Sequence, residues 1–290
     1  MTQLSAVVPV SRMAGKLGYL TEWLTEANKY DLEIIIVHDK QDSETSSELR
    51  SLISNTKNPR IIFIEGLFGN PGGARNAGLE RVTGNWIVFW DSDDLPCINK
   101  ILTETYDAGN DVEVVIGQYQ VINVNTGIVG TNGEHKSIRD VAMNPGLWRM
   151  IFKSESIQDV RFPNLRMAED QVFLSRIRIA EKRVKFTSNV LYKYHTGIHS
   201  QLTNSKNALS DLPQAMRQIG SHASFVNSNQ LKFDMFLMAR QLITTLTKAP
   251  LLSRIPAVIA IFKLDSKRRV ISLWFLAQSM IYIVGHRRGR

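Results

Sequence analysis

The sequence predicts an α/β protein: a mostly parallel sheet flanked by helices, followed by a helical C-terminal extension. Three observations support this class. Apolar runs and amphipathic segments alternate through the first part of the chain, and such alternation requires crossover connections between parallel strands. Acidic or polar residues follow several of the apolar runs, as expected at the edge of a sheet where ligands bind. From residue 211 onward the pattern is helical, and Pro250 and Pro256 are expected to interrupt it.

The predicted elements follow one another in a regular order. Short apolar runs predict strands at residues 4–10, 33–37, 60–64 and 86–90. Amphipathic segments predict helices at residues 17–28, 43–54 and 73–82. Residues 112–129 alternate like strands on either side of an Asn-Thr-Gly turn. A helix is predicted to begin near Glu169, and KFTSNVLYKYHTGIHSQLT is expected to form a short strand and a polar loop.

Length and composition limit the class of protein. A chain of 290 residues with 43% hydrophobic residues can form one large α/β domain or two small ones. The single cysteine, Cys97, excludes an intramolecular disulfide and a multi-cysteine zinc site, and it fits a reducing compartment. The first residues lack a basic segment followed by a long apolar one, so no secretory signal is expected.

Basic residues are concentrated at the C-terminus. Residues 251–290 contain eight Lys or Arg against one acid, Asp265, and so account for +7 of the net charge of +8. A basic and apolar C-terminus indicates anionic lipid, whereas a diffuse basic surface would indicate nucleic acid. The apolar stretch at residues 270–285 is shorter than the about 20 residues that a membrane span needs. We interpret it as a helix on the membrane surface, with LLSRIPAVIAIFKL as a second one. The alternative is a helical subdomain packed on the rest of the protein.

The segment NWIVFWDSDDLP joins an apolar strand to three carboxylates, Asp91, Asp93 and Asp94. Carboxylates gathered at a strand end repel one another and lose hydration unless a cation or hydrogen-bond donors compensate. Oxygen ligands of this kind suit Mg²⁺ or Mn²⁺. The pattern therefore indicates a divalent-metal site, and a capped helix start at Asp93 or Asp94 is the alternative.

Five segments in chain order resemble the motifs of family 2 glycosyltransferases of the GT-A fold: VVPVSR, EIIIVHDKQDS, GNPGGARNAGL, IVFWDSDDLP and RMAEDQVFL. The resemblance covers residues 4–205. It implies a GT-A catalytic domain at residues 1–205, with a nucleotide-binding half at 1–96 and an acceptor-binding half at 97–205. Residues 206–290 would then be a basic helical region that associates with a membrane surface.

The resemblance implies donor-binding roles for residues of the first half. These nucleotide-sugar-binding candidates are Pro9, Val10, Ser11, Asp39, Arg75, Asp91 and Ser92. Asp39 stands where the family places a carboxylate that accepts the N–H donors of the nucleobase, and capping of the next turn is the alternative. Arg75 would reach the nucleotide or its diphosphate. The sequence departs from the family where Ser11 and Arg12 replace an aromatic residue and an asparagine, and where His38 replaces an aspartate.

Residues 91–93 resemble the DXD motif, which implies Mn²⁺ or Mg²⁺ as cofactor. Asp93 is the expected metal ligand, with Asp91 facing the ribose or the metal. His199 is a further candidate ligand, and Asp94 is expected to be a supporting or capping residue. The cation would neutralise charge that builds on the leaving diphosphate. Because Mg²⁺ takes substrate phosphates as ligands, metal binding is expected to be weak without nucleotide.

The pair Glu169 and Asp170 resembles the family's ED motif, which implies Asp170 as the general base and Glu169 as its positioning residue. Inverting transfer needs one carboxylate to accept the proton of the acceptor hydroxyl. Helix capping is the alternative for both residues. On the acceptor side, Trp148 is expected either to stack on a sugar or to be a core aromatic residue. His195 is a second acceptor-side candidate.

The resemblance to family 2 glycosyltransferases implies a metal-dependent inverting glycosyltransferase of cell-surface polysaccharide biosynthesis. It would move a sugar from a nucleotide diphosphate, expected to be UDP, to a hydroxyl of a glycan or lipid-linked glycan. The alternatives are a sugar-phosphate nucleotidyltransferase and a non-catalytic glycan- or nucleotide-binding partner in a membrane assembly. No nucleic-acid partner is expected, and the expected location is cytoplasmic, peripheral at the inner face of the cell membrane. The sequence identifies neither the donor sugar, nor the acceptor, nor the oligomeric state.

Overall fold

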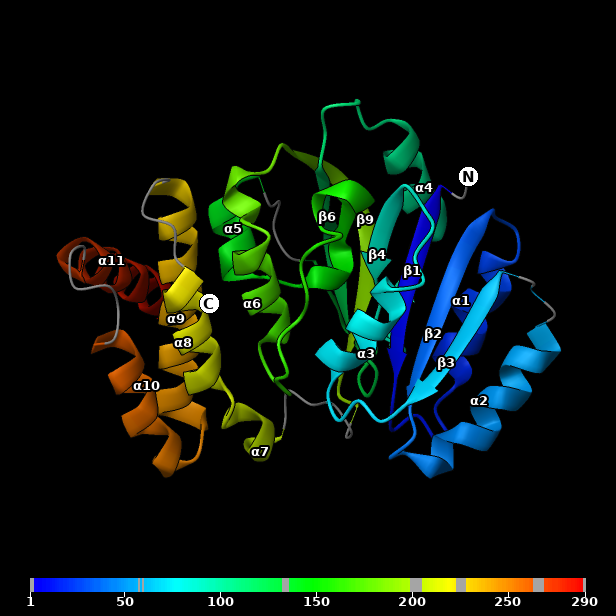
Figure 1. The fold of residues 1–290 in the computed structure, drawn as a ribbon, viewed down its shortest axis with the longest axis horizontal. Helices are drawn as coiled ribbons and strands as arrows, with labels where there is room; N and C mark the ends of the chain where they lie inside the picture. The colour runs from blue at the N-terminus through cyan, green and yellow to red at the C-terminus, as the bar shows by residue number, and fades with distance from the viewer. Residues whose placement is uncertain are drawn as a thin grey trace. The chain divides into compact units, whose positions relative to one another are not determined.

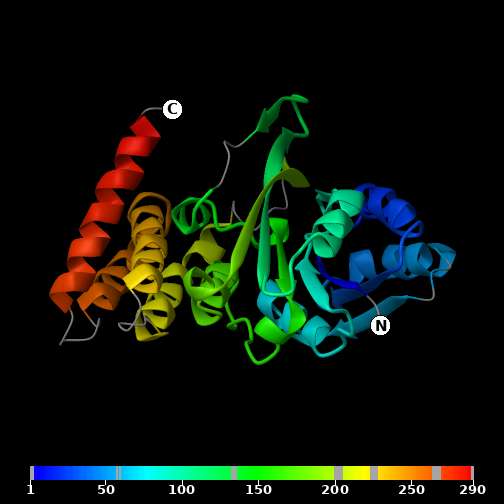
Figure 2. The same cartoon turned by 90° about the horizontal axis from the view of Figure 1, so that it is seen from above.

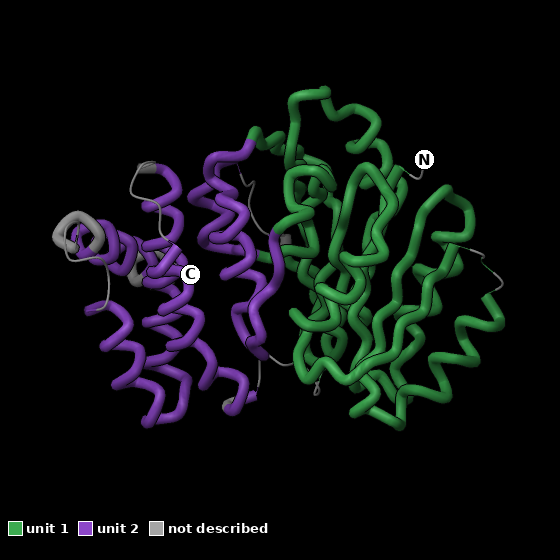
Figure 3. The backbone as a smooth tube through the Cα atoms, viewed as in Figure 1, with its two compact units in different colours: residues 1–135, 146–159, 183–200 green, residues 136–145, 160–182, 201–290 purple. Residues whose placement is uncertain are grey.

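The structure, a computed structural model, comprises two compact units, shown in different colours in Figure 3. It describes residues 3–56, 58, 60–131, 136–198, 205–222, 228–262 and 269–288. Unit 1 consists of residues 1–135, 146–159 and 183–200. Unit 2 consists of residues 136–145, 160–182 and 201–290. Residues 136–145 and 160–182 thus group with the C-terminal helices, and the predicted domain boundary at residue 205 stays a prediction.

Unit 1 is built on a single sheet whose first strands are parallel (Figure 1). These strands are β1 (Leu4–Val10), β2 (Leu32–Asp39), β3 (Ile61–Gly66) and β4 (Trp86–Phe89). β1 lies between β2 and β4, and β3 pairs with the other side of β2. β1, β2 and β4 are almost wholly buried, which explains their continuous apolar runs, because both faces of a parallel sheet are covered.

Three helices of unit 1 connect these strands as predicted, and a fourth, which was not predicted, follows β5 (Leu95–Pro96). They are α1 (Gly18–Ala27), α2 (Ser43–Thr56), α3 (Pro71–Leu79) and α4 (Ile98–Tyr106). α3 approaches β1 closely at Gly78, where an added Cβ would lie 2.4 Å from Cγ1 of Val7. Glycine at this position therefore sets how near α3 lies to the sheet. Trp23 of α1 and Trp90 pack edge to face in the buried core, with ring centroids 5.4 Å apart.

The second half of the sheet is mixed. Its strands are β5 (Leu95–Pro96), β6 (Val114–Asn123), β7 (Val129–Thr131), β8 (Met150–Lys153) and β9 (Val184–Thr196). The strand order is β3-β2-β1-β4-β8-β6-β9-β5, and β7 pairs with β6. β8 is antiparallel to both of its neighbours, whereas β6 and β9 are parallel. The sheet is thus less parallel than its first half suggests, and β9 is longer than the short strand predicted.

Unit 2 is helical, as predicted for the C-terminal region. Its helices are α5 (Ile138–Met143), α6 (Glu169–Arg176), α7 (Lys206–Leu209), α8 (Leu212–His222), α9 (Ser228–Lys248), α10 (Arg254–Phe262) and α11 (Arg269–Arg288), with short 3-10 turns η3 (Ile179–Glu181) and η5 (Leu251–Ser253). α9 contacts α5, α8 and α11. Pro256 does not break α10, because proline is tolerated in the first turn of a helix.

The apolar stretch at residues 270–285 packs within unit 2. It lies in α11 (red in Figure 2), which contacts α9 and buries Leu276 and Ile283. α11 also exposes Trp274 and Ile281, whose exposed fractions are 55% and 74%. The packing on α9 favours the alternative of a helical subdomain, and association of this stretch with a membrane surface stays a prediction. In the described part of the chain no helix has the length and apolar composition needed to cross a bilayer.

Candidate active site

The carboxyl ends of β1, β2 and β4 lie along one edge of the sheet. Val10 is opposite His38 in the β1–β2 register, and Val7 is opposite Phe89 in the β1–β4 register. The chain segments that follow these strands therefore meet at a common edge. This confirms the expectation that Val10, Asp39 and the acidic cluster share the edge where α/β sheets bind ligands.

Asp39, the last residue of β2, ties two loops of this edge together. Its Oδ1 accepts the Gln41 backbone N–H at 3.1 Å, and its Oδ2 accepts the Gly69 backbone N–H at 2.6 Å. Gly69 has a φ of +69°, which favours glycine. Asp39 thus caps the following turn, as the alternative interpretation held, and its nucleobase role stays a prediction. Near it Val10 is buried, Pro9 is half-buried and Ser11 is exposed.

The glycine-rich segment forms the start of α3 and directs Arg75 toward the acidic cluster. Asn70 caps this helix by accepting the Gly73 backbone N–H at 2.8 Å, and Pro71 occupies its first turn. One turn later, Nη2 of Arg75 lies 2.9 Å from Oδ1 of Asp91. The Arg75 side chain is almost buried and that of Asp91 is 31% exposed. The structure therefore brings together two of the predicted donor-binding residues.

The acidic turn, residues 91–94, is held by β9. The backbone N–H of Asp91 donates to the Tyr192 hydroxyl at 2.9 Å. The backbone N–H of His195 donates to Oδ1 of Asp94 at 2.7 Å. His195 Nδ1 lies 2.8 Å from the Asp93 carbonyl oxygen. One strand thus fixes the turn through both its backbone and its side chains.

Asp94 is fully buried and does not cap a helix. Burial raises the pKa of its carboxyl well above the usual value, and the neighbouring charges of Asp91 and Asp93 raise it further. The next helix, α4, begins at Ile98, and its N-cap position is Cys97. The alternative interpretation, a capped helix start at Asp93 or Asp94, is therefore wrong. Asp94 instead supports the turn from behind.

The donor set of the acidic turn can be tested against a bound cation. Among the described residues no three His, Cys, Asp or Glu side chains form a group able to hold a metal ion. Asp91 is paired with Arg75 and Asp94 is buried, while Asp93 is half-buried. This set fits a cation that takes one or two protein carboxylates and completes its coordination with substrate phosphates. His199, the other predicted ligand, lies outside the described residues.

Aromatic rings cover the strand that supports the acidic turn. Trp148 stacks on Tyr192 and on Tyr194 with centroid distances of 4.8 and 5.3 Å, and it meets Tyr119 edge to face at 4.6 Å. At Gly146 an added Cβ would lie 2.6 Å from the Trp148 ring, so only glycine fits there. These contacts favour the core interpretation of Trp148. Its stacking on a sugar stays a prediction.

His195, the second acceptor-side candidate, is buried in this structure. Its ring packs against Tyr19 at a centroid distance of 4.5 Å. Its backbone and Nδ1 contact residues of the acidic turn. The predicted contact with an acceptor is therefore not supported, because the imidazole has almost no exposed surface. His195 is better described as a support of the turn.

The predicted base lies on α6 of unit 2. Ala168 precedes this helix with a φ of +63°, a left-handed conformation that is uncommon for residues other than glycine. Glu169 is buried and Asp170 is half-buried. Oδ1 of Asp170 accepts the backbone N–H of Gln171 at 2.8 Å. Asp170 thus satisfies one free N–H of the first turn, where the helix dipole favours a negative charge.

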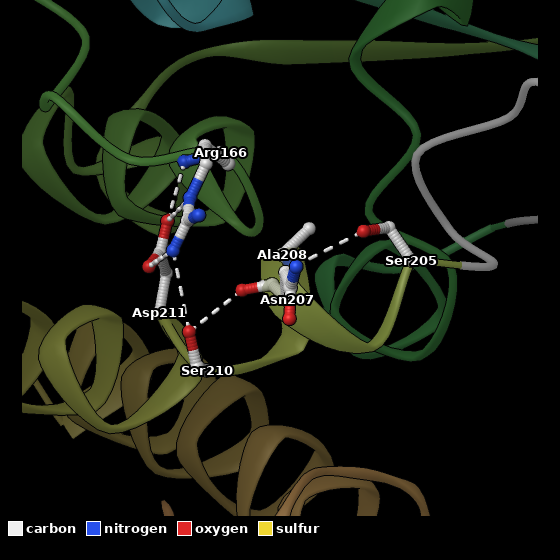
Figure 4. A network of polar contacts seen from close by, with 6 residues as sticks. All are labelled: Arg166, Ser205, Asn207, Ala208, Ser210 and Asp211. Atoms are coloured by element: carbon white, nitrogen blue, oxygen red, sulfur yellow. Dashed lines mark hydrogen bonds and ion pairs between the residues drawn. The ribbon is translucent and has the colours of Figure 1, made fainter.

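An ion pair anchors the loop that leads into α6 (Figure 4). Arg166 donates through Nη2 to Oδ1 of Asp211 at 2.7 Å and through Nε to Oδ2 at 3.0 Å, while its backbone N–H donates to Oδ2 at 2.8 Å. Its Nη2 also donates to Oγ of Ser210 at 3.2 Å. Burial alone would raise the pKa of Asp211, but the hydrogen bonds from Arg166 hold it below the usual value. This pairing fixes the position of the loop within unit 2.

Sequence reasoning missed the residues that support these groups. Tyr192 holds the acidic turn, and Arg166 with Asp211 anchors the loop before α6. The alternation of Tyr192 and Tyr194 in YKYH was a usable signal, because residues two apart face the same side of a strand. Nothing in the sequence indicates the pairing of Arg166 with Asp211, which lies 45 positions away.

A family model described as Glycosyl transferase family 2 matches residues 5–184. Glycosyltransferase GlyA of Streptococcus pneumoniae serotype 4 is 23% identical over 66% of the chain. Poly(ribitol-phosphate) beta-N-acetylglucosaminyltransferase TarS of Staphylococcus aureus is 25% identical over 68% of the chain. The chain spans only about a third of these two relatives, 30% of GlyA and 36% of TarS.

Solved structures show the same fold. The crystal structure of S. aureus TarS 1-349 in complex with UDP-GlcNAc has a TM-score of 0.70 at 18% identity, covering 99% of this chain and 92% of that one. The mannosyltransferase PcManGT from Pyrobaculum calidifontis, in complex with GDP-Man and Mn²⁺, has a TM-score of 0.55 at 15% identity, with coverage of 97% and 86%. These similarities confirm the predicted GT-A architecture.

Proposed function

The chain belongs to glycosyl transferase family 2, and on this basis we propose that it transfers a sugar, with inversion, from a UDP-sugar to a hydroxyl of a glycan or lipid-linked glycan in cell-surface polysaccharide synthesis. The acidic turn carries the proposal. It presents Asp91 and Asp93 at the carboxyl edge of parallel strands, with the Arg75 guanidinium bonded to Asp91. Carboxylates that hold a divalent cation, next to a guanidinium group, can bind a diphosphate, because the cation and the guanidinium both attract phosphate oxygens.

The donor would lie along this edge of the sheet. Asp39 would accept N–H donors of the base, which requires exchange of its bonds to Gln41 or Gly69. Residues 9–11 and Ser92 would line the nucleoside. Arg75 would donate hydrogen bonds to the diphosphate while it stays paired with Asp91, because a guanidinium group has several N–H donors. The TarS structure is a complex with UDP-GlcNAc, and this supports a UDP-sugar as donor.

Asp93 and Asp91 would hold Mn²⁺ or Mg²⁺ together with the donor phosphates. The bound cation would neutralise charge on the departing nucleoside diphosphate. Tyr192 and Asp94 keep the backbone of the turn in place, so the carboxylates need little rearrangement on binding. The PcManGT structure is a complex with Mn²⁺, and this supports a metal of the same kind.

Asp170 would accept the proton of the acceptor hydroxyl while that oxygen forms its bond to the anomeric carbon. Its half-buried carboxylate at the start of α6 and the anchored loop before it support this role. Glu169 would position the first turn of α6 from its buried site. Trp148 is the candidate for sugar contact on the acceptor side.

A thermal-shift screen tests the donor site. UDP, GDP and ADP are each added with and without Mn²⁺, and ligands that bind only the folded state raise the unfolding temperature. We expect UDP to raise the unfolding temperature most, and to do so more strongly with Mn²⁺. Equal shifts with and without the metal would contradict the metal site, and a larger shift with GDP would contradict the assignment of the base.

The products distinguish transfer from the two alternatives. A glycosyltransferase releases nucleoside diphosphate from the donor, whereas a sugar-phosphate nucleotidyltransferase releases pyrophosphate from a nucleoside triphosphate. A non-catalytic partner would bind nucleotide and show not even slow hydrolysis of any nucleotide sugar. We expect release of UDP from a UDP-sugar.

A further inference from the structure

Helix α10 places its small side chains inside and its large ones outside. Ala257 and Ala260 are buried on the side where α10 contacts α8, and Ser253 is buried in the preceding turn η5. These three positions are spaced four and three residues apart, so they lie on one face of the helix. Small residues allow two helices to approach closely, but they bury little apolar area.

The opposite face of α10 and η5 is an exposed apolar stripe, here called the α10 stripe. It is formed by Leu251, Leu252, Ile255, Val258, Ile259 and Phe262. Their exposed fractions run from 40% at Val258 to 88% at Leu252. The spacing of three and four residues aligns them along one side. Large apolar side chains gathered in this way on a surface mark a site of interaction, whereas single exposed ones need no explanation.

The charge of the surrounding sequence indicates what the α10 stripe binds. Lys248, which precedes η5, is exposed. Residues 251–290 contain eight Lys or Arg and only one acid, Asp265. Apolar contact by a second copy of the chain would bring two such basic segments together, which charge repulsion disfavours. An anionic bilayer instead offers an apolar interior to the stripe and negative headgroups to the basic residues.

We propose that the α10 stripe docks the protein on an anionic membrane surface, with α10 lying in the plane of the interface. Leu252 and Phe262, near the two ends of the stripe, enter the boundary between headgroups and acyl chains. α11 packs on α9 and buries Leu276 and Ile283, while Trp274 and Ile281 of α11 are exposed. Docking does not require sugar transfer, so a failed vesicle experiment and a failed transfer assay are distinguishable results.

Vesicle sedimentation with the full chain tests the proposal. Vesicles of phosphatidylcholine with 30 mol% phosphatidylglycerol (about a third, as in an anionic leaflet) are compared with vesicles of phosphatidylcholine alone. We expect binding to the anionic vesicles that weakens at high salt, because salt screens the basic residues. The double variant Leu252→Glu/Phe262→Glu should partition at least about tenfold less, since it removes two apolar anchors and adds like charge.

A matched control is available in unit 1. Ile128 and Val129, which are 68% and 53% exposed near the turn between β6 and β7, are both replaced, as Ile128→Glu/Val129→Glu, to add the same charge outside the α10 stripe. This variant should bind as the unchanged protein does, and circular dichroism checks that all variants are folded. Equal vesicle binding by the Leu252→Glu/Phe262→Glu variant, or no anionic preference, overturns the proposal. The proposal is also overturned if the unchanged protein is a dimer and only the Leu252→Glu/Phe262→Glu variant is a monomer, because a second copy would then cover the stripe.

Discussion

Both units bury an aspartate completely, but they do so in different settings. In unit 1, Asp94 lies beside two less buried acids, and a neighbouring strand donates hydrogen bonds to it. In unit 2, Asp234 lies within α9 and accepts a bond from Nε2 of Gln230 at 2.8 Å, one helical turn away. Burial raises the pKa of both carboxyls, to about 7 for Asp234. The difference lies in the neighbours: Asp94 lies next to Asp91 and Asp93 in one turn at a sheet edge, whereas Asp234 is near one acid, Glu181, and one base, Arg178.

A buried carboxylate is therefore not by itself the sign of a site. Asp234 lies among packed helices, and the free-energy cost of burying its carboxyl group lowers the stability of unit 2. Asp94 supports a turn that presents two other carboxylates. The free-energy cost of burying its carboxyl group is therefore part of forming the proposed site. What distinguishes the two is the chemistry of the immediate neighbours. The following experiments separate groups that act in catalysis from groups that only affect folding.

The largest effect is expected for Asp170→Asn. Removal of the proposed general base should lower the turnover of sugar transfer by about 10²–10⁴-fold, while nucleotide binding stays unchanged. Steady-state assays of UDP release in the presence of acceptor, together with thermal shifts by UDP, measure both quantities. Glu155→Gln, which alters an exposed carboxylate of unit 1, is the control. Full turnover in Asp170→Asn would remove this residue from the mechanism.

Asp93→Asn should lower transfer by about 10²-fold or more, because a ligating carboxylate is lost. Unlike Asp170→Asn, it should also abolish the part of UDP binding that depends on Mn²⁺. Calorimetric titration with UDP, with and without Mn²⁺, measures this difference. Asp107→Asn, at the end of α4, should behave as the unchanged protein. Metal-dependent binding that survives in Asp93→Asn would contradict the assigned ligand.

Asp234 predicts how stability changes with pH. Its folded-state pKa of about 7 lies above the ordinary value of 3.8, so its stabilising contribution is complete below pH 3.8 and is lost as pH rises through 7. Between pH 5 and pH 7 the loss should be about 2 to 3 kcal/mol in the free energy of unfolding. Asp234→Asn should remove this slope while leaving turnover unchanged. Denaturant unfolding at several pH values measures this slope. If the slope were the same in Asp234→Asn as in the unchanged protein, Asp234 would not be its source.

The smallest effect is expected for Tyr192→Phe. Loss of the hydroxyl leaves the Asp91 N–H without this partner, a cost of about 1 to 3 kcal/mol. Metal-dependent UDP affinity should fall about tenfold. Tyr194→Phe changes the neighbouring ring of the same stack and serves as the matched control. Equal losses of affinity in both variants would mean that the stack, and not the hydroxyl, positions the turn.

Local pattern predicted the elements of unit 1 well. Apolar runs identified β1 to β4, and the rule for parallel strands correctly predicted that Asp39 and Asp91 lie at one edge of the sheet. The glycine-rich segment correctly indicated a helix start, because Asn70 and Pro71 are typical of one. The family resemblance named Asp93 and Asp170 as site residues, and their roles stay predictions.

Long-range relations were not predictable. Residues 160–182 join unit 2 through contacts with distant helices, which no local signal encodes. Periodicity shows that α10 and α11 each have an apolar face, but it does not say which face is covered. For this reason the sequence indicated two surface-lying helices, one in each segment, without showing which apolar residues are exposed. The support of the acidic turn by Tyr192 likewise spans 101 positions.

The dependence of the acidic turn on β9 also sets an order of assembly. Residues 91–94 leave the ribosome about a hundred residues before Tyr192 and His195, their partners. Pairing of β6 with β9 and of β5 with β9 closes long loops, which is slow in folding. The parallel strands β1 to β4 can therefore pair during synthesis while three neighbouring carboxylates remain solvated. The turn takes its final form only when β9 has been synthesised and has paired with the sheet, so the proposed site forms late during synthesis of the chain.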